Sequence, residues 1–244
     1  MSGDFDLQGY HSRIRDGVCD IVADRLSRAA TPLQVELILE KAVEFAEEMT
    51  ADLQRRYPIS EPLACSAGCS FCCHNHEVHA APLEAIRIAR YVSTRMTDNQ
   101  RSAVAGRVAE VMAQKREIDK LARPPGTRRI FPCPLLDPES GLCQVYDVRP
   151  LVCRGHNSID LGACRARHAS GTEEGARILG GVVQRTVAQA VLSGLRKAGL
   201  KIGDTDRVLD LTRALDVLLA SPEAIQEAID NPAYLDVASA RTRD

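Results

Sequence analysis

The distribution of cysteine is the feature that most constrains how this chain can fold. Four cysteines fall within the nine residues of the segment Cys65-Ser-Ala-Gly-Cys69-Ser-Phe-Cys72-Cys73. Four more follow at nearly even intervals, at Cys133, Cys143, Cys153 and Cys164. A thiolate binds soft metals well but is readily oxidised, so a bound metal is the simplest use for eight clustered thiols. The sequence therefore predicts a metalloprotein.

A disulfide framework fits this pattern poorly. The total of nine cysteines is odd, and Cys72 and Cys73 are adjacent. The ninth cysteine, Cys19, stands alone in a helical pattern and is expected to be an ordinary buried residue. The N-terminal residues are acidic where a signal peptide would be basic, and no segment approaches the roughly 20 apolar residues of a membrane helix. We therefore expect a cytoplasmic protein with reduced thiols and no membrane partner.

The charge of the chain is nearly balanced, with 31 Lys and Arg against 33 Asp and Glu in 244 residues. No strong positive field points toward nucleic acid, so no nucleic-acid partner is expected. The partner or substrate is expected to be a protein whose identity the sequence leaves open.

Apolar residues recur at helical spacing in several segments, which predicts a mainly α fold with a bundle-like scaffold. Thr31-Pro32-Leu33-Gln34 has the form of a helix start, with Thr31 as the N-cap, and this helix is expected to end at Tyr57-Pro58. Further helices are predicted in six places: residues 11–30, two segments within 82–122, and residues 172–198, 204–219 and 221–229.

Residues 123–171 differ from the rest, because they are rich in Pro, Gly, Arg and Cys and show no sustained period. A short β-hairpin, from Leu135-Leu136 and residues 142–146, is the most regular structure expected there. A compact domain seldom contains an unsupported loop longer than about 15 residues. A structural thiolate site can contribute on the order of 10 kcal/mol to folding, comparable with the roughly 5–15 kcal/mol that stabilises a whole domain. We therefore expect a bound metal to hold residues 123–171 in a fixed conformation.

The chain is expected to form one integrated domain with three parts. Residues 1–60 supply N-terminal helices, and residues 172–244 supply C-terminal helices. Residues 61–171 form the cysteine-rich, metal-binding region, with two inserted helices at 82–122.

The sequence leaves the metal open between an iron–sulfur cluster and zinc. Closed zinc sites usually draw two ligands from each of two short knuckles. Iron–sulfur sites often combine three closely spaced cysteines, here Cys65, Cys69 and Cys72, with a remote one. Because adjacent residues point in divergent directions, Cys72 and Cys73 do not easily serve one zinc ion. These features favour a 4Fe–4S cluster over zinc, and eight thiols leave room for a second metal site.

Positively charged side chains near the later cysteines could offset the negative charge of a thiolate site. Arg149 and Arg154 are the candidates for this role around the metal, whereas Arg165 and Arg167 are explained equally well as solvated arginines. Five histidines accompany the two patches, although the cysteines suffice without them: His74, His76, His79, His156 and His168.

The cysteine patches together resemble a known family. The resemblance rests on Cys65-x3-Cys69-x2-Cys72-Cys73, Cys133-Pro134-Leu135-Leu136, Cys143-x-Val-Tyr146-Asp147-x-Arg149-Pro150-x-x-Cys153-Arg154 and Asn157-Ser158-x-Asp160-x3-Cys164. This pattern is similar to the YkgJ-type cysteine-cluster family, described as zinc- or iron-chelating domains, over about 100 residues. The resemblance implies metal binding by these eight cysteines. Some relatives look like flagellin lysine N-methylases, which implies S-adenosylmethionine as a cofactor, but the chain shows no methyl-donor motif of a strand followed by a Gly-rich turn.

The run from Cys65 to Cys72 also looks like the cluster loop of radical S-adenosylmethionine enzymes. Those enzymes are built on βα barrels, whereas this chain lacks repeated strand–helix alternation. The additional Cys73 and the later cysteines fit the chelating family better.

The sequence therefore predicts a metal-binding protein for electron transfer, metal handling or support of a modification reaction. One alternative is an S-adenosylmethionine-dependent protein lysine methyltransferase or another iron–sulfur-dependent modifying enzyme. The other is a structural zinc domain that mediates protein contacts. Whether the protein is an enzyme stays open.

Overall fold

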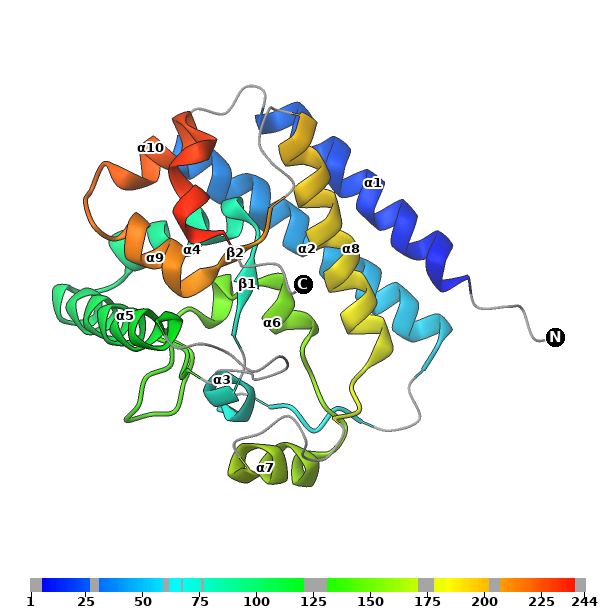
Figure 1. Ribbon diagram of the computed structural model, residues 1–244. Coiled ribbons are helices and arrows are strands. Elements are labelled where there is room, and N and C mark those ends of the chain that lie inside the picture. The colour runs from blue at the N-terminus through cyan, green and yellow to red at the C-terminus, as the bar shows by residue number, and fades with distance from the viewer. Residues whose placement is uncertain are drawn as a thin grey trace.

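The computed structural model describes residues 6–26, 31–58, 62–66, 68–75, 77–120, 131–170, 178–201 and 207–239 (Figure 1). These residues are mainly α-helical, as the sequence predicted, with one small two-stranded sheet. The helices are α1 (Leu7–Leu26), α2 (Pro32–Arg56), α3 (Phe71–Asn75), α4 (Pro82–Arg95), α5 (Asp98–Asp119), η1 (Tyr146–Val148), α6 (Leu151–Gly155), α7 (Leu161–Ser170), α8 (Val182–Lys201), α9 (Leu211–Leu218), α10 (Ala224–Asp230) and η2 (Pro232–Ala238). The strands are β1 (His79–Ala80) and β2 (Leu209–Asp210).

Three long helices, α1, α2 and α8, pack together on one side of the molecule (Figure 1). Helices α8 and α1 approach closely at Gly194, where an added Cβ would lie 2.6 Å from the carbonyl oxygen of Arg15. A residue with a side chain would therefore push α8 away from α1. Cys19, on α1, is fully buried in this core, which confirms its predicted role as an ordinary apolar residue.

Helix α2 begins where the sequence predicted it. The hydroxyl oxygen of Thr31 accepts a hydrogen bond of 3.3 Å from the backbone nitrogen of Gln34, and Pro32 occupies the first helical position. At the other end, the backbone nitrogen of Tyr57 donates to the carbonyl oxygen of Leu53. Local capping chemistry thus sets both ends of this helix.

The second group of helices consists of α4, α5, α9, α10 and η2. Helix α9 contacts α4, α5 and η2, and α4 also packs on α2, so one hydrophobic core runs through both groups. Strand β1 precedes α4 and pairs antiparallel with β2, with His79 opposite Asp210. None of the helices in the described part of the chain is long and apolar enough to cross a membrane.

Three helices begin later than predicted, and one of them, α10, begins at Ala224 instead of residue 221. Helix α8 begins at Val182, and residues 178–181 before it are irregular, while 172–177 lie outside the described residues. Gly180 and Gly181 lie outside the helix, against Asn157. A Cβ on Gly180 would be only 2.4 Å from the carbonyl oxygen of Asn157, so this close contact needs a residue without a side chain. Helix α9 begins at Leu211 because residues 209–210 form β2, and the carboxylate of Asp210 caps it by accepting from the backbone nitrogen of Thr212.

The cysteine-rich region contains more regular structure than predicted. Between residues 131 and 170, η1, α6 and α7 are helical, but each is too short to show a clear hydrophobic period. The predicted hairpin is reduced to one antiparallel bridge between Leu136 and Cys143. The sheet that does form joins two-residue strands from distant parts of the sequence, which carry no local signal.

Candidate metal centre

The first cysteine patch lies on an irregular segment that leads into α3. Gly68 has a φ of 86°, a left-handed conformation that favours glycine, and it turns the chain between Cys65 and Cys69. Helix α3 then carries Cys72 and Cys73, and the backbone nitrogen of Cys73 donates to the carbonyl oxygen of Ser70. The tight turn and the short helix therefore bring four thiols into a small volume.

The second patch takes each cysteine from a different local structure. Cys133 lies in an irregular segment, Cys143 lies in the bridge to Leu136, and Cys153 and Cys164 lie on α6 and α7. Helix α6 is fixed on α8 at Gly155, where a Cβ would lie 2.6 Å from the Cβ of Ala188. The thiols of this patch are thus held by the scaffold as well as by their own loops.

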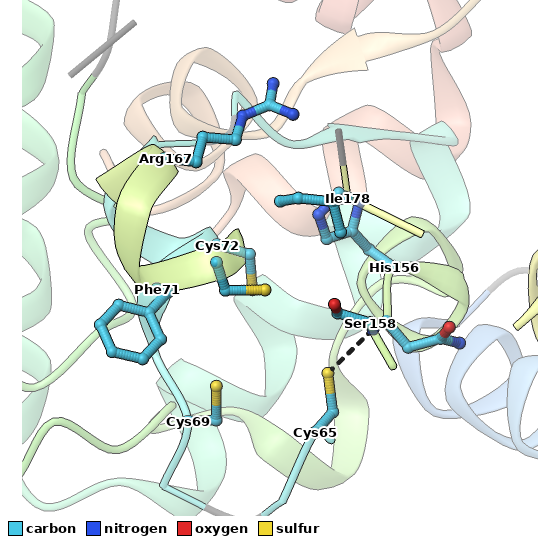
Figure 2. Close-up of a pocket in the computed structure, with 10 residues that line it drawn as sticks. Cys65, Cys69, Phe71, Cys72, His156, Ser158, Arg167 and Ile178 are labelled. Atoms are coloured by element: carbon cyan, nitrogen blue, oxygen red, sulfur yellow. Dashed lines mark hydrogen bonds between the residues drawn. The ribbon is translucent and has the colours of Figure 1, made fainter. Parts of the chain in front are cut away.

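Backbone hydrogen bonds join the two patches. The nitrogen of Cys133 donates to the carbonyl oxygen of Cys73 at 2.8 Å, and the nitrogen of Ala64 donates to the carbonyl oxygen of Ser158 at 2.7 Å. The nitrogen of Ser158 in turn donates to the sulfur of Cys65 at 3.2 Å (Figure 2). Helices α3 and α7 also pack on each other. The fold therefore brings together cysteines that are far apart in the sequence.

The joined patches enclose a cavity of about 520 Å³. Every one of the eight clustered cysteines except Cys164 lines it. Cys164 lines a smaller adjoining pocket of about 50 Å³ together with Cys65, Cys69 and Cys72 (Figure 2). The eight thiols that the sequence selected thus surround two neighbouring hollows.

All nine cysteines are free thiols. Burial raises the pKa of Cys65, Cys143 and Cys153, and it raises the pKa of Cys133 to about 11. The pKa of Cys72 is also raised, first by its hydrogen bond with Cys73 and then by burial. Metal binding at these thiols must therefore displace protons.

The thiols of the two patches are farther apart than the ligands of an assembled metal site. Within the described residues, no group of three or more His, Cys, Asp or Glu side chains is already arranged to hold one metal ion. Soft thiols around one hollow are nevertheless a donor set that suits zinc or iron.

Two arginines line the larger cavity, as do the thiols. The guanidinium of Arg149 lies 3.9 Å from the centre of the Tyr146 ring, and its buried Nε has no hydrogen-bond partner. Arg149 also lies close enough to Cys143 to oppose the effect of burial on the pKa of that thiol. Arg154 is held by the carboxylate of Glu47 and by backbone carbonyl oxygens of residues 147 and 149. Arg149 is therefore the arginine with a group free to face a bound anion or thiolate.

The remaining candidates are spread around the site. Arg167 and His156 line the smaller pocket, and Arg165 is exposed. The ring of His168, on α7, lies 5.0 Å from the ring of His74 and 5.5 Å from the ring of Phe71, both on α3, as measured between ring centroids. His79 lies near the carboxylate of Glu77, and His76 is outside the described residues.

Two contributors to the site were not predicted as site residues. Ser158 acts through its backbone nitrogen, which any residue except proline would supply. Gln184 lies in the helical pattern of α8, yet it lines the larger cavity and its buried Oε1 has no hydrogen-bond partner. Only the packing of α6 on α8 places Gln184 beside the thiols.

Comparison with known proteins agrees with this arrangement. Residues 64–173 match the model of the CxxCxxCC family, described as "Putative zinc- or iron-chelating domain". This match confirms the resemblance to a cysteine-cluster family, and it supports metal binding by the cysteines. Neither a curated protein nor a solved structure matches the chain.

Proposed function

Because residues 64–173 match the model of a family described as a zinc- or iron-chelating domain, we propose that the protein binds an iron–sulfur cluster in its cysteine-lined cavity. The proposed ligands are the eight clustered cysteines, and Arg149 and Arg154 are proposed to balance the charge around them. The protein is assigned to the cytoplasm, where free thiols stay reduced.

The observation that carries this proposal is the number of thiols around one large hollow. Seven of the eight clustered cysteines line a cavity of about 520 Å³. A tetrahedral zinc site needs only four thiolates, each about 2.3 Å from the ion. Seven thiols around this hollow are therefore more than one zinc ion can use, which favours a polynuclear group or more than one metal site.

The residues around the cavity have distinct roles in this proposal. The backbone nitrogen of Ser158 donates to the sulfur of Cys65, and such N–H to sulfur bonds stabilise a thiolate when it becomes a ligand. The guanidinium of Arg149 offsets negative charge near Cys143. A bound iron–sulfur cluster would supply one-electron chemistry, which suits electron transfer or support of a modification reaction.

A modifying enzyme is the second candidate function, and one observation favours it. The Nε of Arg149 and the Oε1 of Gln184 are buried and unpartnered, and both residues line the cavity. Ligand sites combine an apolar hollow with a few such convergent polar groups. A small molecule with an acceptor group for Arg149 and a donor group for Gln184 could therefore bind beside the thiols.

Metal analysis of protein purified without air tests the main proposal. We expect iron and acid-labile sulfide in similar amounts. Stoichiometric zinc without iron would replace the proposal with the structural zinc domain, and the absence of both metals would overturn metal binding altogether. Calorimetric titration of the metal-loaded protein with S-adenosylmethionine tests the enzyme candidate, which predicts a binding heat that Arg149→Gln abolishes.

A further inference from the structure

We propose that the eight cysteines form two separate metal centres that meet at the Cys72–Cys73 pair. Cys65, Cys69, Cys72 and Cys164 form the peripheral centre, and Cys73, Cys133, Cys143 and Cys153 form the inner centre. This inference rests on the proposed function, because it divides the same thiols between two sites.

The lining of the two hollows separates the thiols. Cys164 lines only the smaller pocket, whereas Cys73, Cys133, Cys143 and Cys153 line only the larger cavity. Cys65, Cys69 and Cys72 line both. Assigning these three to the centre of Cys164 leaves four thiols for each centre, which is the number that a zinc ion or a 4Fe–4S cluster requires.

Helix geometry explains how one short helix can serve both sides. Successive residues of an α-helix point about 100° apart, because one turn contains 3.6 residues. Cys72 and Cys73 are adjacent on α3, so their side chains leave the helix in different directions. The carbonyl oxygen of Cys73 accepts from the nitrogen of Cys133, which ties Cys73 to the inner group.

The two groups also rest on different supports. Of the peripheral thiols, Cys65 and Cys69 lie before α3, Cys72 lies on α3, and Cys164 lies on α7, which packs on α3 at the edge of the molecule (Figure 1). Cys133 and Cys143 pack against the hydrophobic core, and Cys153 lies on α6, which packs on α8. Cys65, in the peripheral group, is exposed, whereas the other seven clustered thiols are of intermediate exposure. Metal should therefore leave the peripheral centre first when a chelator is added.

Complementary variants test the division. Cys164→Ser should lose only the peripheral metal and Cys143→Ser only the inner metal. The amounts retained by the two variants should then add up to the wild-type content, while Cys19→Ser should retain all of it. If either single variant loses all of the metal, or if both lose the same metal, the thiols form one centre and the proposal is wrong.

Chelator kinetics test the same division in the unaltered protein, which avoids any variant that fails to fold. Release of metal should follow two phases, with the faster phase missing in Cys164→Ser. A single phase in the wild-type protein would overturn the two-centre proposal without affecting metal binding itself. A wild-type protein that contains no metal would instead overturn the proposed function.

Discussion

The backbone nitrogen of Cys133 donates a hydrogen bond of 2.8 Å to the carbonyl oxygen of Cys73. This bond joins the two cysteine patches directly at residues whose own side chains line the cavity. The main chain therefore holds the patches together through a contact that needs no metal. A bound metal would add its free energy to an arrangement that is already connected.

Removal of the metal should expose part of the chain to protease while leaving the scaffold folded. The segment that contains Cys133, Cys143, Cys153 and Cys164 has only short helices of its own, whereas α1, α2, α4, α8 and α9 share the hydrophobic core. After chelation, limited proteolysis followed by mass spectrometry should locate the first cuts within residues 131–170. Cys69→Ser and Cys153→Ser should show the same cuts without chelator, and Cys19→Ser should not. First cuts within α2 or α8 would contradict this prediction.

Arg149→Gln should lower the reduction potential of a bound cluster. The guanidinium lies near Cys143, and a positive charge favours the reduced, more negative form. Its loss should shift the midpoint by on the order of 60 mV to more negative values, which is a tenfold change in a one-electron equilibrium. Protein-film voltammetry measures the shift, and Arg149→Lys should restore part of it.

Arg95→Gln is the matched control for this variant, because Arg95 is exposed at the end of α4. An equal potential in wild-type protein and Arg149→Gln would remove Arg149 from the surroundings of the metal.

Glu84→Ala should destabilise the junction between α4 and α6. The buried carboxylate of Glu84 accepts from the backbone nitrogens of Ala81, at 2.9 Å, and Leu151, at 2.7 Å. The alanine variant leaves both donors without a partner, at a cost of about 1–3 kcal/mol for each. Urea unfolding should show a loss of about 2–6 kcal/mol. As a control, Glu48→Ala at an exposed position of α2 should change the free energy of unfolding by less than about 0.5 kcal/mol.

Lys115→Met should destabilise the protein because it leaves the buried negative charge of Asp210 without its ammonium partner. The ammonium of Lys115 is almost fully buried and pairs with the carboxylates of Glu77 and Asp210. Without it, the buried carboxylate of Asp210 keeps only a contact of 3.5 Å to Arg213 and its helix-capping bonds. The expected loss is about 3 kcal/mol in thermal or urea unfolding.

The double variant Lys115→Met with Asp210→Asn checks the cause of that loss. It should be less destabilised than the sum of the two single variants, because it removes both members of the pair. Additive losses would show that the pairing contributes nothing. Lys120→Met, at an exposed position, should have almost no effect.

The extent to which the sequence predicted the fold varied with the length of each element. Helix α2 was predicted with its N-cap Thr31, and α4 and α5 were predicted as the two helices within residues 82–122, because capping and helical spacing are local properties. The later starts of α8 and α9 were missed, since the contact of Gly180 with Asn157 and the pairing of β2 with β1 depend on distant residues. The short helices α6 and α7 were missed because five to ten residues show little periodicity.

The amino-acid sequence by itself determined the helical class of this protein and selected the eight thiols as candidate ligands, because residue type and spacing are enough to indicate amphipathic helices and clusters of soft donors. Only the tertiary structure decided which thiols are neighbours and that Gln184 and the backbone of Ser158 lie among them. The reason is physical: these neighbours are set by the packing of α6 on α8 and of α7 on α3. Contacts between distant segments depend on the whole core, and no local pattern encodes them.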